Sequence, residues 1–297
     1  GNKAYAEFPR NPSIIMAGVE LHRTTNEHRY LDMANFFIDW RGAQFKGVKK
    51  RNTWGKIESG SDLSQNFRPL REETEVVGHA VFFTYLYAGA ADAYMETGDP
   101  KLMEALERLW VDLTQRKMYI TGGVSPMHKA HPVRSFAPGT LSIIAGDSIH
   151  EGVGGPYDLP NASAYNETCG MIGNMMWNWR MLAITGEARY ADLMELSLYN
   201  AILAGIDIDG DGWSYTNPLR WHGPDHVLLN QDAHKRFDPG ENNICCPTNL
   251  SRTVAAMHGY LYSLDDSGLW IHLYGGNTAE ITLPGNDSIK LTQETQY

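Results

Sequence analysis

The chain has 297 residues, of which 42% are hydrophobic and 20% charged, a balance typical of a soluble globular protein of one large or two modest domains. Its formal charge of −10 argues against nucleic-acid binding, because phosphate binding needs a basic stripe that this sequence lacks. No apolar run reaches the length of about 18 residues that a membrane span needs, and the first residues lack a signal-peptide pattern.

Helical hairpins are predicted at three places in the first two thirds of the chain. The short polar turns Thr25–Glu27, Thr97–Asp99 and Thr185–Glu187 each separate two amphipathic stretches. The stretch after the second turn repeats apolar residues at helical spacing: Leu102, Leu106, Leu109 and Leu113. Hairpins that recur in this way, with long loops such as 122–161 between them, predict an α/α toroid or a solenoid.

The last part of the chain changes from helical to alternating patterns. Positions 204–220 and 268–293 have this character, and Trp270–Tyr274 and Ala279–Leu283 alternate as strands do. We therefore expect a mainly α domain over residues 1–265 and the start of a β domain over 266–297.

The three cysteines are the most informative residues of the sequence: Cys169, Cys245 and Cys246. An odd number, with two of them adjacent, argues against a disulfide scaffold. Three thiolates with the neighbouring carboxylate of Glu167 match the four ligands that zinc accepts. The alternative is that the cysteines are small buried hydrophobic residues.

The local conformation around these ligands is predicted from spacing. Four apolar residues after the cysteine pair indicate a helix: Leu250, Val254, Met257 and Leu261. Pro247 suits its first position, which leaves both thiols at the positive end of the helix dipole, where thiolate is favoured. Glu167 and Cys169 are two residues apart, so an extended, strand-like backbone would point both to the same side.

Four motifs in this order resemble glycoside hydrolase family 127 and its near relative, family 146. They are Gly78-His79-Ala80-Val81, Tyr119-Ile120-Thr121-Gly122-Gly123, the run Tyr157–Asn161 with Tyr165 and Glu167–Cys169, and Cys245-Cys246-Pro247 with Asn249. Each motif alone is weak, but four in the right order are specific. The resemblance extends from about residue 10 to about residue 280.

The resemblance implies a mainly α fold, in which an (α/α)6 barrel is followed by β-sandwich domains. The hairpins of this sequence are too few to close such a barrel, so we expect either a fragment or a protein that associates into a homo-oligomer through its exposed apolar faces. The implied activity is that of a retaining β-L-arabinofuranosidase acting on a carbohydrate, such as a plant cell-wall arabinoside or a pectin-type glycan. A soluble enzyme of the bacterial cytoplasm or periplasm fits this expectation.

The resemblance also assigns residues. It implies a Zn²⁺ ion held by Glu167, Cys169, Cys245 and Cys246, with Cys245 as the nucleophile. Glu151 falls at the position of the general acid/base, and His79 and Tyr215 fall at substrate-contacting positions. The thiolate would attack the anomeric carbon, and water would hydrolyse the resulting thioglycosyl intermediate. As the acid, Glu151 needs a raised pKa, which we expect the neighbouring anionic cluster to supply.

Each assigned residue has a simpler structural interpretation. Glu151 would then be a solvated loop carboxylate, His79 a histidine at a helix start, and Tyr215 a strand tyrosine of the core. A second group of histidines lies in or beside the long loop: His128, His131 and His150. They suggest a second metal site, but their spacing does not support one, and surface positions are expected.

The sequence departs from the family pattern near the expected active site. Phe82 follows the His-Ala-Val motif where the family usually has arginine, Asn11 replaces a substrate histidine, and residues 126–147 resemble an insertion. These differences leave the sugar open, including another pectin side-chain sugar. Two other functions also stay open: a carbohydrate-binding or scaffold protein with a purely structural zinc site, and a glycosidase that uses two ordinary carboxylates.

Overall fold

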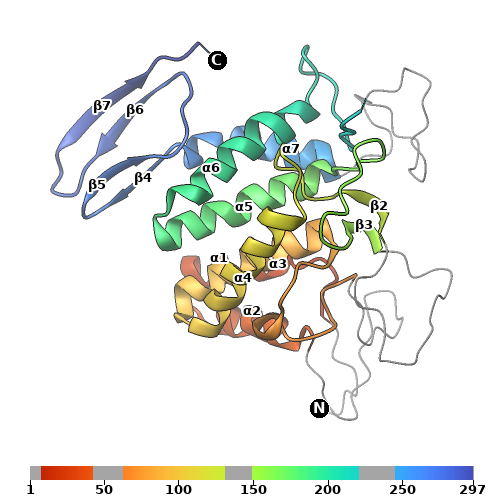
Figure 1. Cartoon of the computed structure of the whole chain (residues 1–297). Helices are drawn as coiled ribbons and strands as arrows, with labels where there is room; N and C mark the ends of the chain where they lie inside the picture. Colours follow the sequence, from red (N-terminus) through yellow and green to blue (C-terminus); the bar gives the residue numbers. More distant parts are fainter. Residues whose placement is uncertain (1–7, 43–62, 131–148, 221–244, 297) are drawn as a thin grey trace, which may run out of the picture.

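The computed structural model describes residues 8–42, 63–130, 149–220 and 245–296 of the chain (Figure 1). The α-helices are α1 (Ser13–Thr25), α2 (His28–Trp40), α3 (Ala80–Thr97), α4 (Pro100–Arg116), α5 (Thr168–Thr185), α6 (Ala188–Ser197) and α7 (Cys245–Ala255). Short helical turns are η1 (Leu70–Glu72), η2 (Leu198–Ile202), η3 (Leu203–Gly205) and η4 (Met257–Tyr260). The strands are β1 (Gly78–His79), β2 (Met127–Ala130), β3 (Ile149–Val153), β4 (Tyr262–Asp265), β5 (Gly268–Ile271), β6 (Asn277–Thr282) and β7 (Ser288–Gln293).

The three predicted helical hairpins are present, and their turns share one hydrogen-bond pattern. The hydroxyls of Thr25, Thr97 and Thr185 each donate to the carbonyl four residues earlier, at 2.7–2.9 Å. Each hydroxyl also accepts the N–H two residues later, at 3.1–3.4 Å. The residue between has a left-handed conformation, with φ of 57° at Asn26, 66° at Gly98 and 69° at Gly186. The same Thr-x-acid turn therefore ends one helix and begins the next three times.

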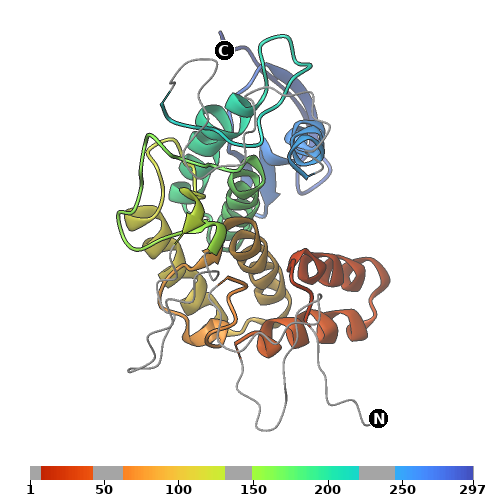
Figure 2. The ribbon, with the colours of Figure 1, turned by 90° about the vertical axis from the view of Figure 1, so that its right-hand side faces the viewer.

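The hairpins stand side by side, so that the odd-numbered helices form one layer. Helix α1 packs on α3, α3 on α5 and α5 on α7, while α2, α4 and α6 pack as the second helix of each hairpin. Figure 2 shows the hairpins following one another in an open arc. Gly173 permits the close approach of α5 to α3, because a Cβ there would lie 2.8 Å from the Thr84 Cβ.

A buried acid ties the three hairpins together. Asp92 on α3 accepts hydrogen bonds from Arg23 of α1 at 3.2 Å and from Arg180 of α5 at 2.7 Å. Its carboxylate is almost fully buried and is paired on both oxygens, which is the condition under which a buried charge is tolerated. Asp92 therefore fixes the relative positions of the first and third hairpins through the second.

A three-stranded antiparallel sheet in the order β1–β3–β2 lies at one end of the helices. In it Gly78 faces Val153, His79 faces Gly152, and Lys129 faces His150. The chain entering β1 is fixed by α4, because Asp112 accepts the N–H of Val76 at 2.6 Å and Lys117 donates to its carbonyl at 2.7 Å. This anchoring holds β1 against β3.

The C-terminal strands form two small sheets, β4–β5 and β6–β7. The strand predicted over Ala279–Leu283 corresponds to β6, and the one predicted over Trp270–Tyr274 is shorter, since β5 ends at Ile271. The expected division at residues 265 and 266 falls in the turn between the paired strands β4 and β5. Between 204 and 220 the only strand-like pairing among the described residues is the isolated bridge of Ile206 with Trp213.

Three local predictions are wrong. Glu167 to Cys169 is not strand-like: Glu167 is the N-cap residue of α5, and Cys169 lies in its first turn. Pro247 is the third residue of α7 rather than the first. The first turn of a helix has no intrahelical partner for its N–H groups, so proline is tolerated there too. The predicted apolar face also divides, since α7 ends at Ala255 and Leu261 follows a short turn.

No helix among the described residues is long and apolar enough to cross a membrane. The helix layer is instead arranged around close contacts within the protein, of which the contact of α3 with α5 is the most extensive.

Replacing Gly173 by alanine tests this contact. The added methyl would meet the Thr84 hydroxyl, which is held by a 2.9 Å hydrogen bond to the Ala80 carbonyl, so the helices must separate. We expect a loss of about 1–3 kcal/mol in the free energy of unfolding, measured by denaturant titration. Gly259→Ala is the matched control, because no atom lies within 4 Å of the added Cβ. Equal stability of the two variants would contradict the close packing of α3 on α5.

Candidate functional site

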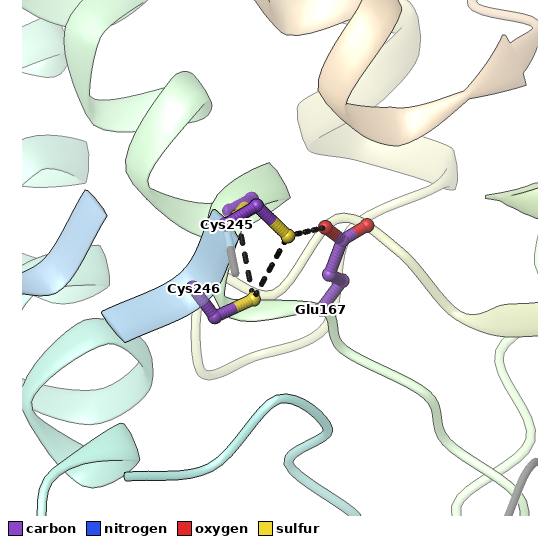
Figure 3. Close-up of side chains that lie close together, drawn as sticks. Glu167, Cys245 and Cys246 are labelled. Atoms are coloured by element: carbon purple, nitrogen blue, oxygen red, sulfur yellow. Dashed lines mark hydrogen bonds between the residues drawn. The ribbon is translucent and has the colours of Figure 1, made fainter. Parts of the chain in front are cut away.

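The four predicted ligands lie together in one cluster. Figure 3 labels three of them, Glu167, Cys245 and Cys246. The Cys169 and Cys246 sulfurs are 3.3 Å apart, Cys245 Sγ is 3.9 Å from Cys246 Sγ, and Cys245 Sγ is 3.9 Å from Glu167 Oε1. All four ligand atoms lie within 4.8 Å of one another. The alternative of small buried hydrophobic residues does not describe Cys245, which is exposed, whereas Cys169 and Cys246 are buried beside Val81 and Tyr85.

Two helix N-termini bring the cluster together. Glu167 caps α5 and Cys169 lies in its first turn, while Cys245 and Cys246 open α7, which packs on α5. The positive ends of both helix dipoles therefore point at four acidic groups, an arrangement that favours their ionised forms. An extended segment at Glu167 was expected to point the ligands to one side. In the structure, the N-termini of α5 and α7 bring them together instead.

The four acidic groups of the cluster differ in pKa because each one affects the ionisation of its neighbours. Burial, together with the nearby Glu151 and Cys245 charges, raises the pKa of Glu167 well above its usual range, and burial does the same for Cys246. The hydrogen bond between Cys169 and Cys245 raises the pKa of the Cys169 thiol. Hydrogen bonds from Cys169 and Cys246 lower the pKa of Cys245 to about 3. Cys245, the exposed thiol, is thus the first of the four to ionise.

An outer shell of hydrogen bonds orients one sulfur. Asn249 donates to Cys169 Sγ at 2.9 Å, Tyr85 donates to the Asn249 side-chain oxygen at 3.3 Å, and Arg252 donates to the Tyr85 hydroxyl at 3.0 Å. Metal ligands are commonly held by such partners. By contrast, the buried Glu167 Oε2 has no hydrogen-bond partner among the described residues. An orphaned carboxylate oxygen beside three thiols is the donor set that a soft metal cation would satisfy.

Glu151 lies on the central strand β3 and is only 8% exposed, so its interpretation as a solvated loop carboxylate is wrong. Four side chains contact its oxygens. Tyr165 and Tyr215 donate to Oε1 at 2.6 and 3.1 Å, and His79 Nε2 and His150 Nδ1 lie 3.0 and 3.4 Å from Oε2. Its φ of 53° is unusual for a residue other than glycine, and such strain concentrates at functional sites.

The raised pKa expected for Glu151 is not found. Burial alone would raise it, but hydrogen bonds from His150 and His79 outweigh burial, and the pKa lies well below the usual range. The expectation rested on the neighbouring anionic cluster and overlooked the donors around the carboxylate. In this structure Glu151 is held as the ionised base.

Tyr215 connects Glu151 to the cysteine cluster. Its hydroxyl donates to Glu151 Oε1, and it also lies within hydrogen-bonding reach of Cys245 and Glu167, whose pKa values it helps to lower. The backbone here is fixed by Thr168, which donates its N–H to the Tyr215 carbonyl at 3.0 Å and its hydroxyl to the Ser214 carbonyl at 2.6 Å. Tyr215 therefore lies between Glu151 and the cysteine cluster, and it is not part of a strand.

A cleft of about 730 Å³ opens beside Glu151. His79 and Glu151 line it together with Pro9, Arg10, Asn11, Phe82 and His150. Phe82 stacks on the His79 ring with a centroid distance of 4.1 Å. Thus the two positions that depart from the family pattern, Asn11 and Phe82, both face the cleft. The expected insertion begins in the chain that forms β2, and its residues 131–147 lie outside the described residues.

The prediction of surface histidines is wrong for His128, which is buried. Its Nε2 lies 3.0 Å from His150 Nε2, so the sheet brings together two of the three histidines noted in the sequence. His131 lies outside the described residues. Tyr165 and His150 also contact Glu151, and neither contact was predicted from the sequence. Their signals were Tyr165 within a recognised motif and His150 next to Glu151.

Comparisons with known proteins identify the family of the chain. The sequence profile described as β-L-arabinofuranosidase, GH127 catalytic domain, matches residues 5–259. The chain belongs to this family. A curated relative, the non-reducing end β-L-arabinofuranosidase of Bifidobacterium longum subsp. longum, is 30% identical over 283 residues, which are 91% of this chain and 40% of the relative.

Solved structures of the family have the same fold. One, described as a glycoside hydrolase, has a TM-score of 0.80 and 38% identity, and the match covers 96% of this chain and 44% of that protein. The GH127 β-L-arabinofuranosidase of Geobacillus stearothermophilus T6 has a TM-score of 0.77 and 31% identity over 95% of this chain and 42% of its own. The chain thus spans less than half the length of these relatives.

The difference in acidity within the cluster predicts selective alkylation. In metal-free protein, iodoacetamide should modify the exposed Cys245 before the buried Cys169 and Cys246. A thiol with a pKa of about 3 is fully ionised from pH 5 to 8, so the rate should stay flat over this range. An ordinary thiol would react roughly tenfold faster for each pH unit. Peptide mass spectrometry measures the order of labelling.

Cys245→Ser is the control for this measurement, and it should remove the fast phase while leaving the slow labelling of the other two thiols. Labelling of Cys246 at the rate of Cys245 would contradict the assignment.

Proposed function

We propose that this protein is a retaining glycoside hydrolase of the β-L-arabinofuranosidase kind, with Cys245 as nucleophile and Glu151 as general acid/base. One observation carries the proposal: the Tyr215 hydroxyl donates to Glu151 Oε1 and lies within hydrogen-bonding reach of the Cys245 sulfur. Two atoms that share one hydroxyl lie no more than about 7 Å apart. Such a gap suits a retaining enzyme, in which nucleophile and acid/base act on one sugar carbon from opposite sides.

The proposed reaction has two steps. The Cys245 thiolate attacks the anomeric carbon, and Glu151 gives its proton to the oxygen of the leaving group, so that a C–S bond replaces the C–O bond. In the second step Glu151 removes a proton from water, and the oxygen of that water displaces the sulfur with a second inversion. His79, Tyr165 and Tyr215 orient the carboxylate throughout, and the cleft at Glu151 receives the sugar.

A Zn²⁺ ion is proposed at Glu167, Cys169, Cys245 and Cys246. The donor set fits, since three thiolates and one carboxylate complete a tetrahedral shell and the orphaned Glu167 oxygen gains a partner. Four acidic groups within 4.8 Å cannot all ionise without a cation, because like charges raise one another's pKa. When bound, zinc would keep the thiols ionised at neutral pH.

We infer that the hairpins are part of an (α/α)6 barrel over residues 1–265, and that the strands beyond begin a β-sandwich. The layer of odd-numbered helices and the similarity to longer family members support this inference. The proposed substrate is a terminal arabinofuranoside of a plant cell-wall or pectin-type glycan. Asn11 and Phe82 in the cleft are the residues through which a different sugar preference would arise.

A purely structural metal site explains less of the geometry. Such a site has no need of an exposed, acidic thiol among its ligands, nor of a buried carboxylate with four hydrogen-bonding partners next to a cleft. A glycosidase with two ordinary carboxylates is not favoured either. Glu167 would have to be the second carboxylate, but it lies among the three thiols and its pKa is raised.

Replacing the nucleophile gives the decisive test. Cys245→Ser should lower kcat on an aryl β-L-arabinofuranoside by a factor of about 10³ or more. Without the thiolate the covalent step cannot occur, and the other catalytic residues then contribute little. Mass spectrometry of the wild-type protein during turnover should find the sugar attached to Cys245, and NMR should find the released sugar with retained configuration. Thr248→Ala, a neighbouring exposed change, should retain activity. Hydrolysis by Cys245→Ser would exclude the thiolate mechanism.

Metal binding should depend on pH in a defined direction. Glu167 and Cys246 have raised pKa values, so protons compete with the metal, and the affinity for Zn²⁺ should fall at least about tenfold per pH unit from pH 8 to pH 6. Competition with a chromogenic chelator measures this affinity, and Co²⁺ substitution reports thiolate ligation by its charge-transfer absorption.

Cys246→Ser should weaken zinc binding by more than the roughly 10–100-fold that loss of an outer-shell partner costs. The exposed change Ser251→Ala should leave it unaltered. Zinc binding that is independent of pH, or equal in Cys246→Ser, would contradict the proposed ligand set.

A further inference from the structure

A pair of histidines connects the interior of the sheet to Glu151. His128 on β2 and His150 on β3 face each other through their Nε2 atoms at 3.0 Å, and His150 Nδ1 lies 3.4 Å from Glu151 Oε2. His128 is 4% exposed, whereas the His150 side chain is 47% exposed. The antiparallel pairing of Lys129 with His150 fixes their relative position. The three groups form a continuous hydrogen-bonded row.

The other histidine at Glu151 has a fixed tautomer. His79 is the N-cap residue of α3, and its Nδ1 accepts the N–H of Val81 at 3.2 Å. That nitrogen therefore carries no proton, so Nε2 must carry one and can only donate to Glu151 Oε2. Of the two histidines at this oxygen, only His150 can either donate to the carboxylate or accept a proton from the carboxylic acid.

We propose that His128 and His150 form a proton relay. The relay protonates Glu151 before Glu151 acts as an acid, and it takes the proton back after Glu151 has acted as a base. The proposal rests on the role of Glu151 in the proposed function. In that function Glu151 must carry a proton before the first step. Its four hydrogen-bonding partners stabilise the ionised carboxylate, so the proton has to be supplied by another group. Both histidines act through Glu151 and are positioning residues.

The proton count closes over one reaction cycle. The His128 imidazolium gives its Nε2 proton to His150 Nε2, and His150 gives its Nδ1 proton to Glu151 Oε2, which passes a proton to the leaving oxygen. In the second step water gives a proton to Glu151, the same shifts run in reverse, and His128 is again an imidazolium. No proton is gained or lost by the three residues over the cycle.

The His128 ring stacks on Tyr165 with a centroid distance of 5.0 Å, so an aromatic face lies beside the ring that carries the proton in the proposed relay. The other charged or titratable groups facing Glu151 are His79 from β1, Tyr165 and Tyr215 from the segments beside α5, and Glu167 and Cys245 from the cluster. Arg10 acts on the same site through His79.

A metal ion at His79, His150 and Glu151 is the competing interpretation, because their ligand atoms also lie within 4.8 Å of one another. The tautomer of His79 argues against it. A metal would need the Nε2 lone pair, while the Val81 N–H already occupies Nδ1, so the displaced proton would have no place on the ring.

The test compares substrates that differ in their need for an acid. His128→Ala and His150→Ala should lower kcat/KM about 10–100-fold for an alkyl or disaccharide leaving group, and less than about threefold for a 4-nitrophenyl leaving group, which departs without a proton. Added imidazole should restore part of the loss in His150→Ala. His258→Gln, an exposed histidine on η4, is the matched control and should behave as the wild type.

The outcomes separate the relay from its alternatives. Equal losses on both substrates would make the histidines structural and overturn the relay, and a second equivalent of Zn²⁺ lost in His150→Ala would make the group a metal site. Nitrogen NMR of ¹⁵N-histidine protein tests the relay without turnover: the titration of His128 should change in Glu151→Gln. An unchanged titration would overturn the relay even where hydrolysis is normal, whereas no hydrolysis by the wild type would refute the proposed function alone.

Discussion

The mutual repulsion of four acidic groups is the constraint on which the site depends. Three thiols and a carboxyl lie within 4.8 Å of one another, and the structure relieves their repulsion by unequal ionisation. Two helices start at this point, so their dipoles favour negative charge where side chains alone would oppose it. The contact of α5 with α7 therefore has an electrostatic effect as well as a packing one. The hairpin layer places the N-termini of these two helices at the same point.

A second electrostatic arrangement lies on the sheet. Hydrogen-bond donors surround Glu151, whereas the members of the cysteine cluster lie beside other acidic groups. The Tyr215 hydroxyl lies between Glu151 and this cluster. The two arrangements have opposite effects: donors make Glu151 a stable anion, and crowding makes all but one of the cluster groups reluctant to ionise. This difference supports separate roles for the carboxylate on the strand and the carboxylate at the helix start.

Much of this was predictable from the sequence, and the remainder depended on distant contacts. The Thr-x-acid turns specify the hairpins because each turn is closed by its own threonine hydroxyl, a local interaction. The grouping of Glu167 with the three cysteines was predictable from residue chemistry and motif order. The conformation of Glu167 and the burial of His128 were not, because both depend on segments that pair across the fold, such as Thr168 with Tyr215 and β2 with β3. The low pKa of Glu151 has a local and a distant cause: His150 is its neighbour on β3, whereas His79, Tyr165 and Tyr215 lie on three other segments.

The position of Glu151 on the middle strand of its sheet has a consequence for the course of the reaction. Strands pair with β3 on both sides, and four side chains contact the Glu151 oxygens, so the carboxyl group has little freedom to move. An acid that stays in place serves the departing group and the incoming water from one position. The departing alcohol must therefore leave before water enters, and any other alcohol that reaches the vacated position competes with water for the sugar. On the proposed mechanism, the same rigidity that aids hydrolysis also makes the protein a potential catalyst of glycoside synthesis.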